Sequence, residues 1–239
     1  DAQSIIDYQL YDSAFPSELY NGPATSTSPM GGSRGGLRDP ASVKTIETPA
    51  HTIAFTFVSR EPGELYVIGG AGTTSNYISK VDPLTLSTLK KTFLTAGSLP
   101  FWAPSVAVHA NGYIYVTAQN VCYKLDADLN IQSYYILPIK GQPGGTGLYN
   151  SMKVLSNGNI ICKGFFEPSR KGKQPYSIIT VLGTNLSLIK DIPLPEASYG
   201  RLSVHIHNNK EYVYVTGDTT LIRYEHRPGE DPPLVLDTT

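Results

Sequence analysis

The feature that most constrains the fold is a hairpin pattern that the sequence repeats four times. Each copy has two runs of alternating apolar residues on either side of a tight polar turn. The turns lie at Pro62-Gly63, Asn111-Gly112, Asn157-Gly158 and Asn208-Asn209, so that residues 63, 112, 158 and 209 are 49, 46 and 51 positions apart. Asn-Gly between alternating runs is the strongest short-range signal for a β-hairpin. The sequence therefore predicts one hairpin unit repeated four times.

Two further strands are expected after each hairpin. In the second unit, VCYKLDADLNIQSYYILP, a third strand ends at a polar turn and a fourth alternating run follows. The equivalent segments are YISKVDPLTLSTLKKTFL, SIITVLGTNLSLIKDIPLP and TLIRYEHRPGEDPPLVLD. Units of about 45–50 residues with four antiparallel strands are typical of β-propeller blades. We therefore predict an all-β fold, a β-propeller with about four four-stranded blades.

The predicted boundaries divide the chain into an irregular N-terminal arm, residues 1–41, and a propeller region, residues 42–239. The blades are expected at about 42–98, 99–143, 144–196 and 197–239. Because each blade covers its neighbours, we expect these four to form part of a larger ring of about six to eight blades. A protein partner, a second copy or a further segment would then complete the ring over apolar outer faces of the first and fourth blades. A closed four-bladed ring is the alternative.

Two stretches carry a family resemblance. YIYVTAQNVCYKLDADLN (residues 113–130) and YVYVTGDTTLIRYE (residues 212–225) resemble the broad group of quinoprotein-like, NHL and other YVTN-type propellers. The resemblance extends over about residues 42–239. Since families with unrelated functions share this architecture, the resemblance implies the propeller fold and leaves the activity and any cofactor open.

Composition and charge exclude several classes of function. Nineteen basic and 20 acidic residues give a net charge of −1, which does not favour nucleic-acid binding. No apolar run reaches the roughly 18 residues of a membrane-spanning helix. The start at Asp1 and the low charged fraction of 16% favour a secreted, extracellular protein. Asn185, in an Asn-Leu-Ser sequon at a predicted turn, is the candidate glycosylation site.

No metal site is predicted. The five histidines do not recur at equivalent strand positions; Leu155, for example, occupies the place of His109 in the next unit. The DADLN segment (residues 126–130) begins like a calcium loop but lacks its glycine, so its acids are interpreted as turn formers. Cys122 and Cys162 lie within predicted strands and are interpreted as buried thiols, with a disulfide as the alternative.

A ligand entrance is expected where the connections that enter the innermost strands converge on the propeller axis. The candidate ligand-binding residues on these connections are His51, Trp102, Tyr149, Asn150, Tyr199 and Arg201. A small molecule or a glycan is the expected ligand class. Trp102, the single tryptophan, is either a stacking platform or a packing residue.

Two functions compete. The absence of a GxSxG nucleophile motif and of a recurring ligand set favours a secreted binding or assembly module. The alternative is a propeller enzyme, either a quinoprotein-type oxidoreductase or a lactonase-like hydrolase, with its remaining blades outside this chain. For a quinone cofactor, Trp102 would supply the aromatic platform and Glu47 and Glu196 are the nearby acids. Whether the protein is an enzyme stays open at this point.

Overall fold

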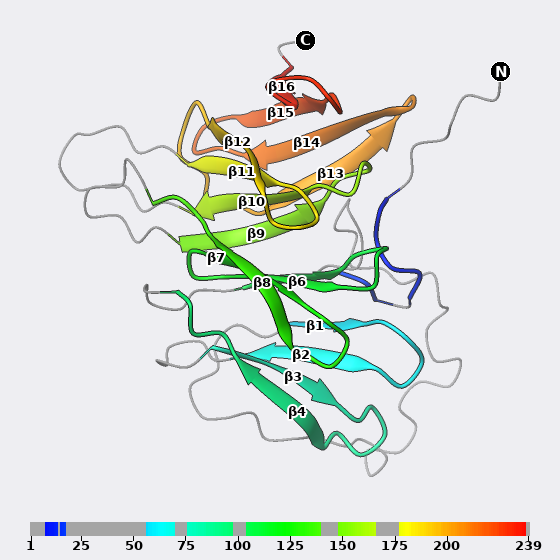
Figure 1. The fold of residues 1–239 in the computed structure, drawn as a ribbon. Coiled ribbons are helices and arrows are strands. Elements are labelled where there is room, and N and C mark those ends of the chain that lie inside the picture. Colours follow the sequence, from blue (N-terminus) through cyan, green and yellow to red (C-terminus); the bar gives the residue numbers. More distant parts are fainter. Residues whose placement is uncertain are drawn as a thin grey trace, which may run out of the picture.

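The computed structural model of the chain describes residues 8–13, 15–17, 56–69, 76–97, 104–139, 148–165 and 177–237. Within these residues sixteen strands form four antiparallel sheets of four strands each, and no helix is present (Figure 1). The all-β, four-stranded prediction is therefore confirmed. In the described part of the chain no helix is long and apolar enough to cross a membrane.

The strands of each sheet follow one another along the chain. Sheet one contains β1 (Thr56–Ser59), β2 (Leu65–Gly69), β3 (Tyr77–Val81) and β4 (Thr88–Phe93), and sheet two contains β5 (Ser105–Val108), β6 (Ile114–Ala118), β7 (Val121–Leu125) and β8 (Ile131–Ile136). Sheet three contains β9 (Leu148–Val154), β10 (Ile160–Phe165), β11 (Ile178–Leu182) and β12 (Leu188–Pro193), and sheet four contains β13 (Leu202–His207), β14 (Lys210–Thr216), β15 (Leu221–His226) and β16 (Leu234–Leu236). Because strands pair in chain order, each sheet is an up-and-down unit.

The turns that define the repeat have the backbone conformation that their residue types favour. Gly112 and Gly158 have φ angles of 83° and 85°, in the left-handed region that glycine adopts without strain. In the fourth unit Asn208 and Asn209 take φ angles of 49° and 57°, which asparagine tolerates better than most residues. These turns fix the strand register within each hairpin.

The hydrophobic core lies in three clusters, one between each pair of neighbouring sheets. Along β6, Ile114 and Val116 pack toward sheet one, whereas Tyr115 packs toward sheet three. This follows from strand geometry, because successive side chains point to opposite faces. Sheet two is thus buried on both faces, and all five residues of β6 are buried.

Sheet four departs from the expectation of an apolar outer face. Val213 and Val215 of β14 pack toward sheet three, while Tyr212 and Tyr214 between them stay half-exposed. The same alternation directs the side chain of Arg223 on β15 outward. Val204, Val213, Val215 and Ile222 of this unit therefore face inward. The outer face carries Tyr212, Tyr214 and Arg223, with the exposed Leu221 at its edge.

The four sheets are stacked in chain order, with sheets one and four at opposite ends (Figure 1). The innermost strands pack as successive neighbours: β1 beside β5, β5 beside β9, and β9 beside β13. Among the described strands, β1 and β13 do not pack closely against each other. The described residues therefore form an open row of sheets rather than a sealed ring.

The described part of the arm, residues 8–13 and 15–17, lies across the ends at which three innermost strands finish. Its hydrogen bonds run from the Ile206 N–H to the Tyr8 hydroxyl (3.3 Å), from the Tyr11 N–H to the Val108 carbonyl (3.0 Å), and from the Ser59 N–H to the Phe15 carbonyl (2.8 Å). These contacts connect the arm to β13, β5 and β1. The opposite end, where the innermost strands begin, is the predicted ligand entrance.

The two cysteines are free thiols buried between sheets two and three, which confirms the thiol interpretation. The Cys162 sulfur lies 3.3 Å from the Thr117 hydroxyl. Contact with Cys162, together with burial, raises the pKa of the Cys122 thiol well above its usual value. Both side chains therefore act as small packing groups.

Candidate functional site

A β-bulge in sheet three sets the geometry of the candidate site. Lys163 of β10 pairs with Ser151 of β9, but the following Gly164 pairs with Tyr149. Asn150 is therefore an extra residue on β9. Through the described residues, the first and second strands of the other three sheets pair without such a shift. Bulges re-aim side chains and are frequent beside functional sites, so this one distinguishes sheet three from its neighbours.

Arg201 connects the beginnings of three innermost strands. It directly precedes β13, and its Nη1 donates to the Asn150 carbonyl near the start of β9 (2.7 Å) and to the Pro104 carbonyl just before β5 (3.4 Å). The Asn150 side-chain amide in turn donates to the Tyr199 carbonyl (2.9 Å). Three of the predicted residues, Asn150, Tyr199 and Arg201, thus meet at the predicted entrance.

Lys163 belongs to the same cluster and was missed at the sequence level. Its side chain is fully buried, and its Nζ donates to the Ser198 carbonyl (2.9 Å), with a longer contact of 3.5 Å to the Gly164 carbonyl. Lys163 forms no ion pair within the described residues. Burial, aided by the positive charge of Arg201, lowers the pKa of the Lys163 amine to about 7. The cluster thus holds a buried amine that carries only part of its usual charge near neutral pH.

A sequence signal for Lys163 exists in the repeat. Counted from the turn glycine or asparagine, Lys163 occupies the place of Ile68, Thr117 and Tyr214 in the other units. A lysine in the middle of a strand whose counterparts are apolar or neutral is unusual, because lysine is rarely fully buried. This comparison between units would have identified it.

Asn150 also contributes a buried acceptor. The residue is 4% exposed, and its Oδ1 atom has no hydrogen-bond partner among the residues that the structure describes. Its side-chain nitrogen and its carbonyl are already engaged by Tyr199 and Arg201, which fixes the side chain. Leaving such an acceptor unpaired costs roughly 1–3 kcal/mol. The atom therefore marks a position at which a donor from a ligand or a water molecule is stabilised.

The remaining predicted ligand-binding residues fall elsewhere. Tyr149 is fully buried in the core between sheets two and three, and its hydroxyl donates to the Pro138 carbonyl (2.7 Å). Burial raises the pKa of Tyr149. His51 and Trp102 lie outside the described residues. Of the six candidates, the structure thus brings three together.

The two acids considered for a quinone site and the glycosylation sequon lie away from this cluster or outside the described residues. Glu196 accepts hydrogen bonds from the backbone N–H groups of Thr219 (2.9 Å) and Thr220 (3.0 Å), so its carboxylate holds a turn of sheet four. Glu47 lies outside the described residues. Asn185 is exposed in the turn between β11 and β12, where its Oδ1 accepts from the Ser187 hydroxyl (2.7 Å).

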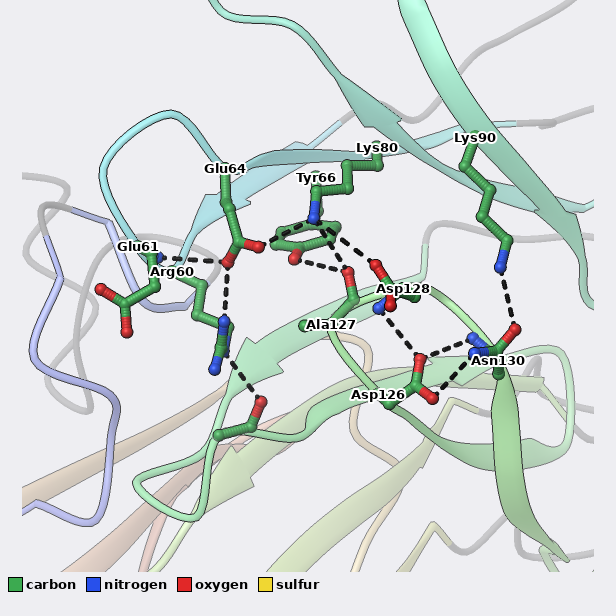
Figure 2. Close-up of polar contacts among 11 residues, drawn as sticks. Arg60, Glu61, Glu64, Tyr66, Lys80, Lys90, Asp126, Ala127, Asp128 and Asn130 are labelled. Atoms are coloured by element: carbon green, nitrogen blue, oxygen red, sulfur yellow. Dashed lines mark hydrogen bonds and ion pairs between the residues drawn. The ribbon is translucent and has the colours of Figure 1, made fainter.

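A second polar cluster lies between sheets one and two (Figure 2). Glu64 accepts from Arg60 Nη1 and from Lys80 Nζ, both at 2.8 Å. Burial alone would raise the pKa of Glu64, but these two hydrogen bonds outweigh it and hold the pKa at about 2. The Arg60 Nε also donates to the Gly112 carbonyl (3.2 Å) of sheet two. Opposite charges are matched here, so the cluster joins two sheets.

The acidic turn of sheet two completes this second cluster. The Tyr66 hydroxyl donates to the Ala127 carbonyl (2.8 Å), and Lys80 Nζ lies 3.9 Å from an oxygen of Asp128. Asp126 Oδ1 accepts the backbone N–H groups of Asp128 and Asn130, both at 2.9 Å (Figure 2). The acids of the DADLN segment are therefore turn formers, as the sequence predicts.

No family model matches the chain, and no curated protein matches it in sequence. Among solved structures, the WD40 domain of Pan2 from Neurospora crassa is similar, with a TM-score of 0.50 and 13% identity over 77% of this chain and 52% of that one. The fold is that of a β-propeller. At this identity the likeness concerns the fold alone.

Two further solved structures are more distant in shape. A protein of unknown function from Bacteroides caccae has a TM-score of 0.47 and 14% identity, covering 74% of this chain and 57% of that one. A GH43_1 enzyme from Xanthomonas citri has a TM-score of 0.39 and 12% identity, covering 78% and 73%. The chain spans little more than half the length of the Pan2 and Bacteroides caccae chains.

Proposed function

We propose that the protein is a β-propeller binding module that takes an anionic group where β9 and β13 begin. Lys163 is the observation that carries this proposal: a buried amine that forms no ion pair with any described residue, beside the guanidinium of Arg201. Buried charges in proteins are normally paired, so a buried amine with only carbonyl contacts among the described residues favours a carboxylate or phosphate from outside. The Oδ1 of Asn150 would accept a hydrogen bond from the same ligand.

The bulge supports this assignment over a purely structural role. A regular pairing of β9 with β10 would not place two consecutive residues, Tyr149 and Asn150, opposite Gly164. The shift brings the Asn150 carbonyl to Arg201 and its side chain to the connection that contains Tyr199. Preorganised groups of this kind give specificity because little has to be ordered when the ligand binds.

The proposal includes assembly of a larger ring. On sheet one, Phe57 and Phe93 are 43% and 53% exposed, and sheet four presents Tyr212, Tyr214 and Arg223 on its outer face. Tyrosine and arginine are enriched in protein interfaces. We infer that a protein partner, a second copy or a further segment covers these faces to complete about six to eight blades. Light scattering on the native protein tests for a partner copy.

Secretion is also part of the proposal. Asn185 is exposed in a turn, as a glycan acceptor must be, and its sequon is intact. The intact mass of the protein purified from its native source tests this. Material without a glycan would remove the main support for an extracellular location.

Titration calorimetry tests the ligand class. The probes are phosphate, citrate and pyruvate as anions and glucose as a neutral sugar. We expect at least one anion to bind, and Arg201→Gln to weaken it about tenfold or more, the loss typical of one charge-assisted contact. Arg60→Gln is the matched control, because it removes a guanidinium from the other polar cluster and should leave the affinity unchanged. Binding of glucose alone, or equal affinity in Arg201→Gln, would overturn the proposal.

A further inference from the structure

We propose that the cavity beside a buried pair, Glu211 and His226, is a second binding site, which takes a neutral polyhydroxylated ligand of about the size of a monosaccharide. This cavity lies at the end of sheet four where β13 finishes, away from the proposed anion site at the beginning of that strand. The two sites share no residue, so each can be tested without the other.

The buried pair occupies a place that is apolar in the other three sheets. Glu211, two residues after the turn residue 209, lies directly opposite His226 on the next strand. The equivalent cross-strand pairs are Leu65 with Val81, Ile114 with Leu125, and Ile160 with Leu182. Buried ion pairs are often no more stabilising than apolar residues of similar volume. Stability alone therefore does not account for this exception in sheet four.

Glu211 fixes the imidazole of His226. The two residues are 1% and 5% exposed, and the Glu211 carboxylate accepts from the Ser156 backbone N–H (2.9 Å), the Ser156 hydroxyl (2.7 Å) and His226 Nδ1 (2.5 Å). Because an ionised carboxylate only accepts hydrogen bonds, the imidazole carries a proton on Nδ1. The other ring nitrogen, Nε2, is buried and has no hydrogen-bond partner among the described residues. One nitrogen is thus held in place, and the second is left to a molecule from outside.

A cavity of about 340 Å³ borders this pair. Ser156, Glu211 and His226 all line it, so that sheets three and four both contribute to its wall. Small-molecule sites have volumes of about 300–1,000 Å³, whereas one water molecule occupies about 30 Å³. The space beside the unpartnered nitrogen is therefore large enough for a small organic ligand.

The charges of the cavity wall are already matched, which favours a neutral ligand. Glu225 lies 3.3 Å from Lys210 Nζ and 3.4 Å from Arg227 Nη2, and Arg227 Nη1 lies 3.6 Å from an oxygen of Glu230. A charged ligand would have to displace one of these partners. A hydroxyl group, in contrast, is both donor and acceptor and can bond to either member of an ion pair.

A hydroxyl group also suits His226 in either protonation state. It can donate to Nε2 of the neutral ring or accept from Nε2–H of the charged ring. A metal ion is the less suitable occupant, because no three His, Cys, Asp or Glu side chains gather to ligate one within the part of the chain that the structure describes. A sugar offers several hydroxyl groups on a rigid ring, so it can reach Nε2 and the matched charges together.

An NMR titration of the full chain tests the inference. Glucose, galactose, mannose and Zn²⁺ are added separately, and the ring resonances of the five histidines are followed, with His226 assigned from the spectrum of His226→Asn. We expect at least one sugar to shift the resonances of His226 and to leave those of His205, which is exposed on the same sheet, in place. Sugar binding without a shift at His226, the absence of binding by all three sugars, or a shift caused by Zn²⁺ alone would overturn the inference.

Variants of the pair separate binding from folding. His226→Asn keeps a donor for Glu211 but removes Nε2, and we expect the sugar affinity to fall about fivefold to tenfold, the loss typical of one hydrogen bond. His205→Asn is the matched control and should leave the affinity unchanged. Glu211→Ile combined with His226→Leu copies the pair Ile114–Leu125 and should keep the melting temperature while losing the sugar. Unchanged affinity in either variant of His226 would overturn the inference, and the wild-type titration decides if the double variant does not fold.

One further variant distinguishes this site from the anion site. Arg201 directly precedes β13 and lies at the other end of sheet four, so Arg201→Gln should leave the sugar affinity unchanged. If Arg201→Gln loses the sugar, the sugar binds at the other site and the second site is wrong. If anions do not bind but a sugar shifts His226, the proposed function is wrong and the second site stands.

Discussion

Two polar clusters of the same molecule differ in whether their basic side chains are paired with a carboxylate. Between sheets one and two, Arg60 and Lys80 share the carboxylate of Glu64. At the beginnings of β9 and β13, Lys163 has two carbonyl contacts and no carboxylate contact within the described part of the chain, and Arg201 adds a second cation. This difference shows that one junction between neighbouring sheets pairs its buried charges internally, whereas the other holds the two basic groups for which we propose a binding role.

Both clusters make the protein more stable as the pH rises, but in different pH ranges and for opposite reasons: the fold favours the charged form of Glu64 and the neutral form of Lys163. The pKa of Glu64 is depressed to about 2, so its contribution to stability is complete above its usual pKa of 4.5 and is lost as the pH falls toward 2. The pKa of Lys163 is depressed from 10.5 to about 7, so the unfolded chain binds the extra proton between these values. Lys163 therefore makes the protein more stable as the pH rises from about 7 to 10.5.

The largest effect is expected when the matched cluster loses its only shared carboxylate. Glu64→Gln leaves Arg60 and Lys80 without their common partner, and we expect the free energy of unfolding to fall by about 1–3 kcal/mol at pH 7. Urea denaturation measures it. The difference from the wild type should shrink as the pH approaches 2. An unchanged midpoint at pH 7 would show that this cluster does not hold sheets one and two together.

A gain in stability, instead of a loss, is expected from a substitution at Lys163. Lys163→Met removes a buried amine that is costly to protonate, and we expect a gain of about 1 kcal/mol or more below pH 7, as when other buried charges are replaced by apolar groups. The stability of the variant should also lose the rise between pH 7 and 10 that the wild type shows. Thermal denaturation at a series of pH values measures both. A loss of stability at pH 6 would mean that the contact with the Ser198 carbonyl outweighs the cost of burial.

The smallest loss of stability is expected for Arg60→Lys, which tests whether charge or geometry accounts for the effect of Glu64→Gln. Arg60→Lys keeps the positive charge next to Glu64 but removes the Nε donor to the Gly112 carbonyl. Because arginine offers several donors in a fixed geometry, we expect a loss below about 1 kcal/mol. The same urea experiment applies. A loss as large as that of Glu64→Gln would assign the cohesion of the cluster to the contact with Gly112 instead of to its charges.

The sequence predicts the framework of this molecule because its signals are local. Turn chemistry at Gly112 and Gly158 and the alternation on either side define the hairpins. Stacking of the units follows from the apolar faces along which neighbouring sheets meet. Arg201 could be placed at the entrance since it directly precedes an innermost strand. Placing a residue at this end of the sheets requires only the order of the strands along the chain.

The details of the site depend on a β-bulge and on packing between sheets, neither of which can be predicted from the alternation of apolar and polar residues. A bulge adds one residue, so the faces of Tyr149 and Asn150 cannot be assigned by counting along β9. Alternation along β10 does not decide whether Lys163 is buried, because its burial depends on the sheet packed against that face. Only the comparison with Ile68, Thr117 and Tyr214 in the other units marks it as unusual. The polar outer face of sheet four, in contrast, could have been read from the alternation in β14 and β15.

The path of the arm dictates the order in which the chain can assemble. Each sheet closes through hairpins between neighbouring segments, whereas the contact of Tyr8 with Ile206 joins residues 198 positions apart. The entropy lost on closing a loop grows with its length, and the arm gains its partners only once β1, β5 and β13 are in place. Docking of the arm is thus a late event in folding, and its release is an early one in unfolding. The Val108 N–H, which donates to the Pro16 carbonyl, would then exchange with solvent while every hairpin is still intact.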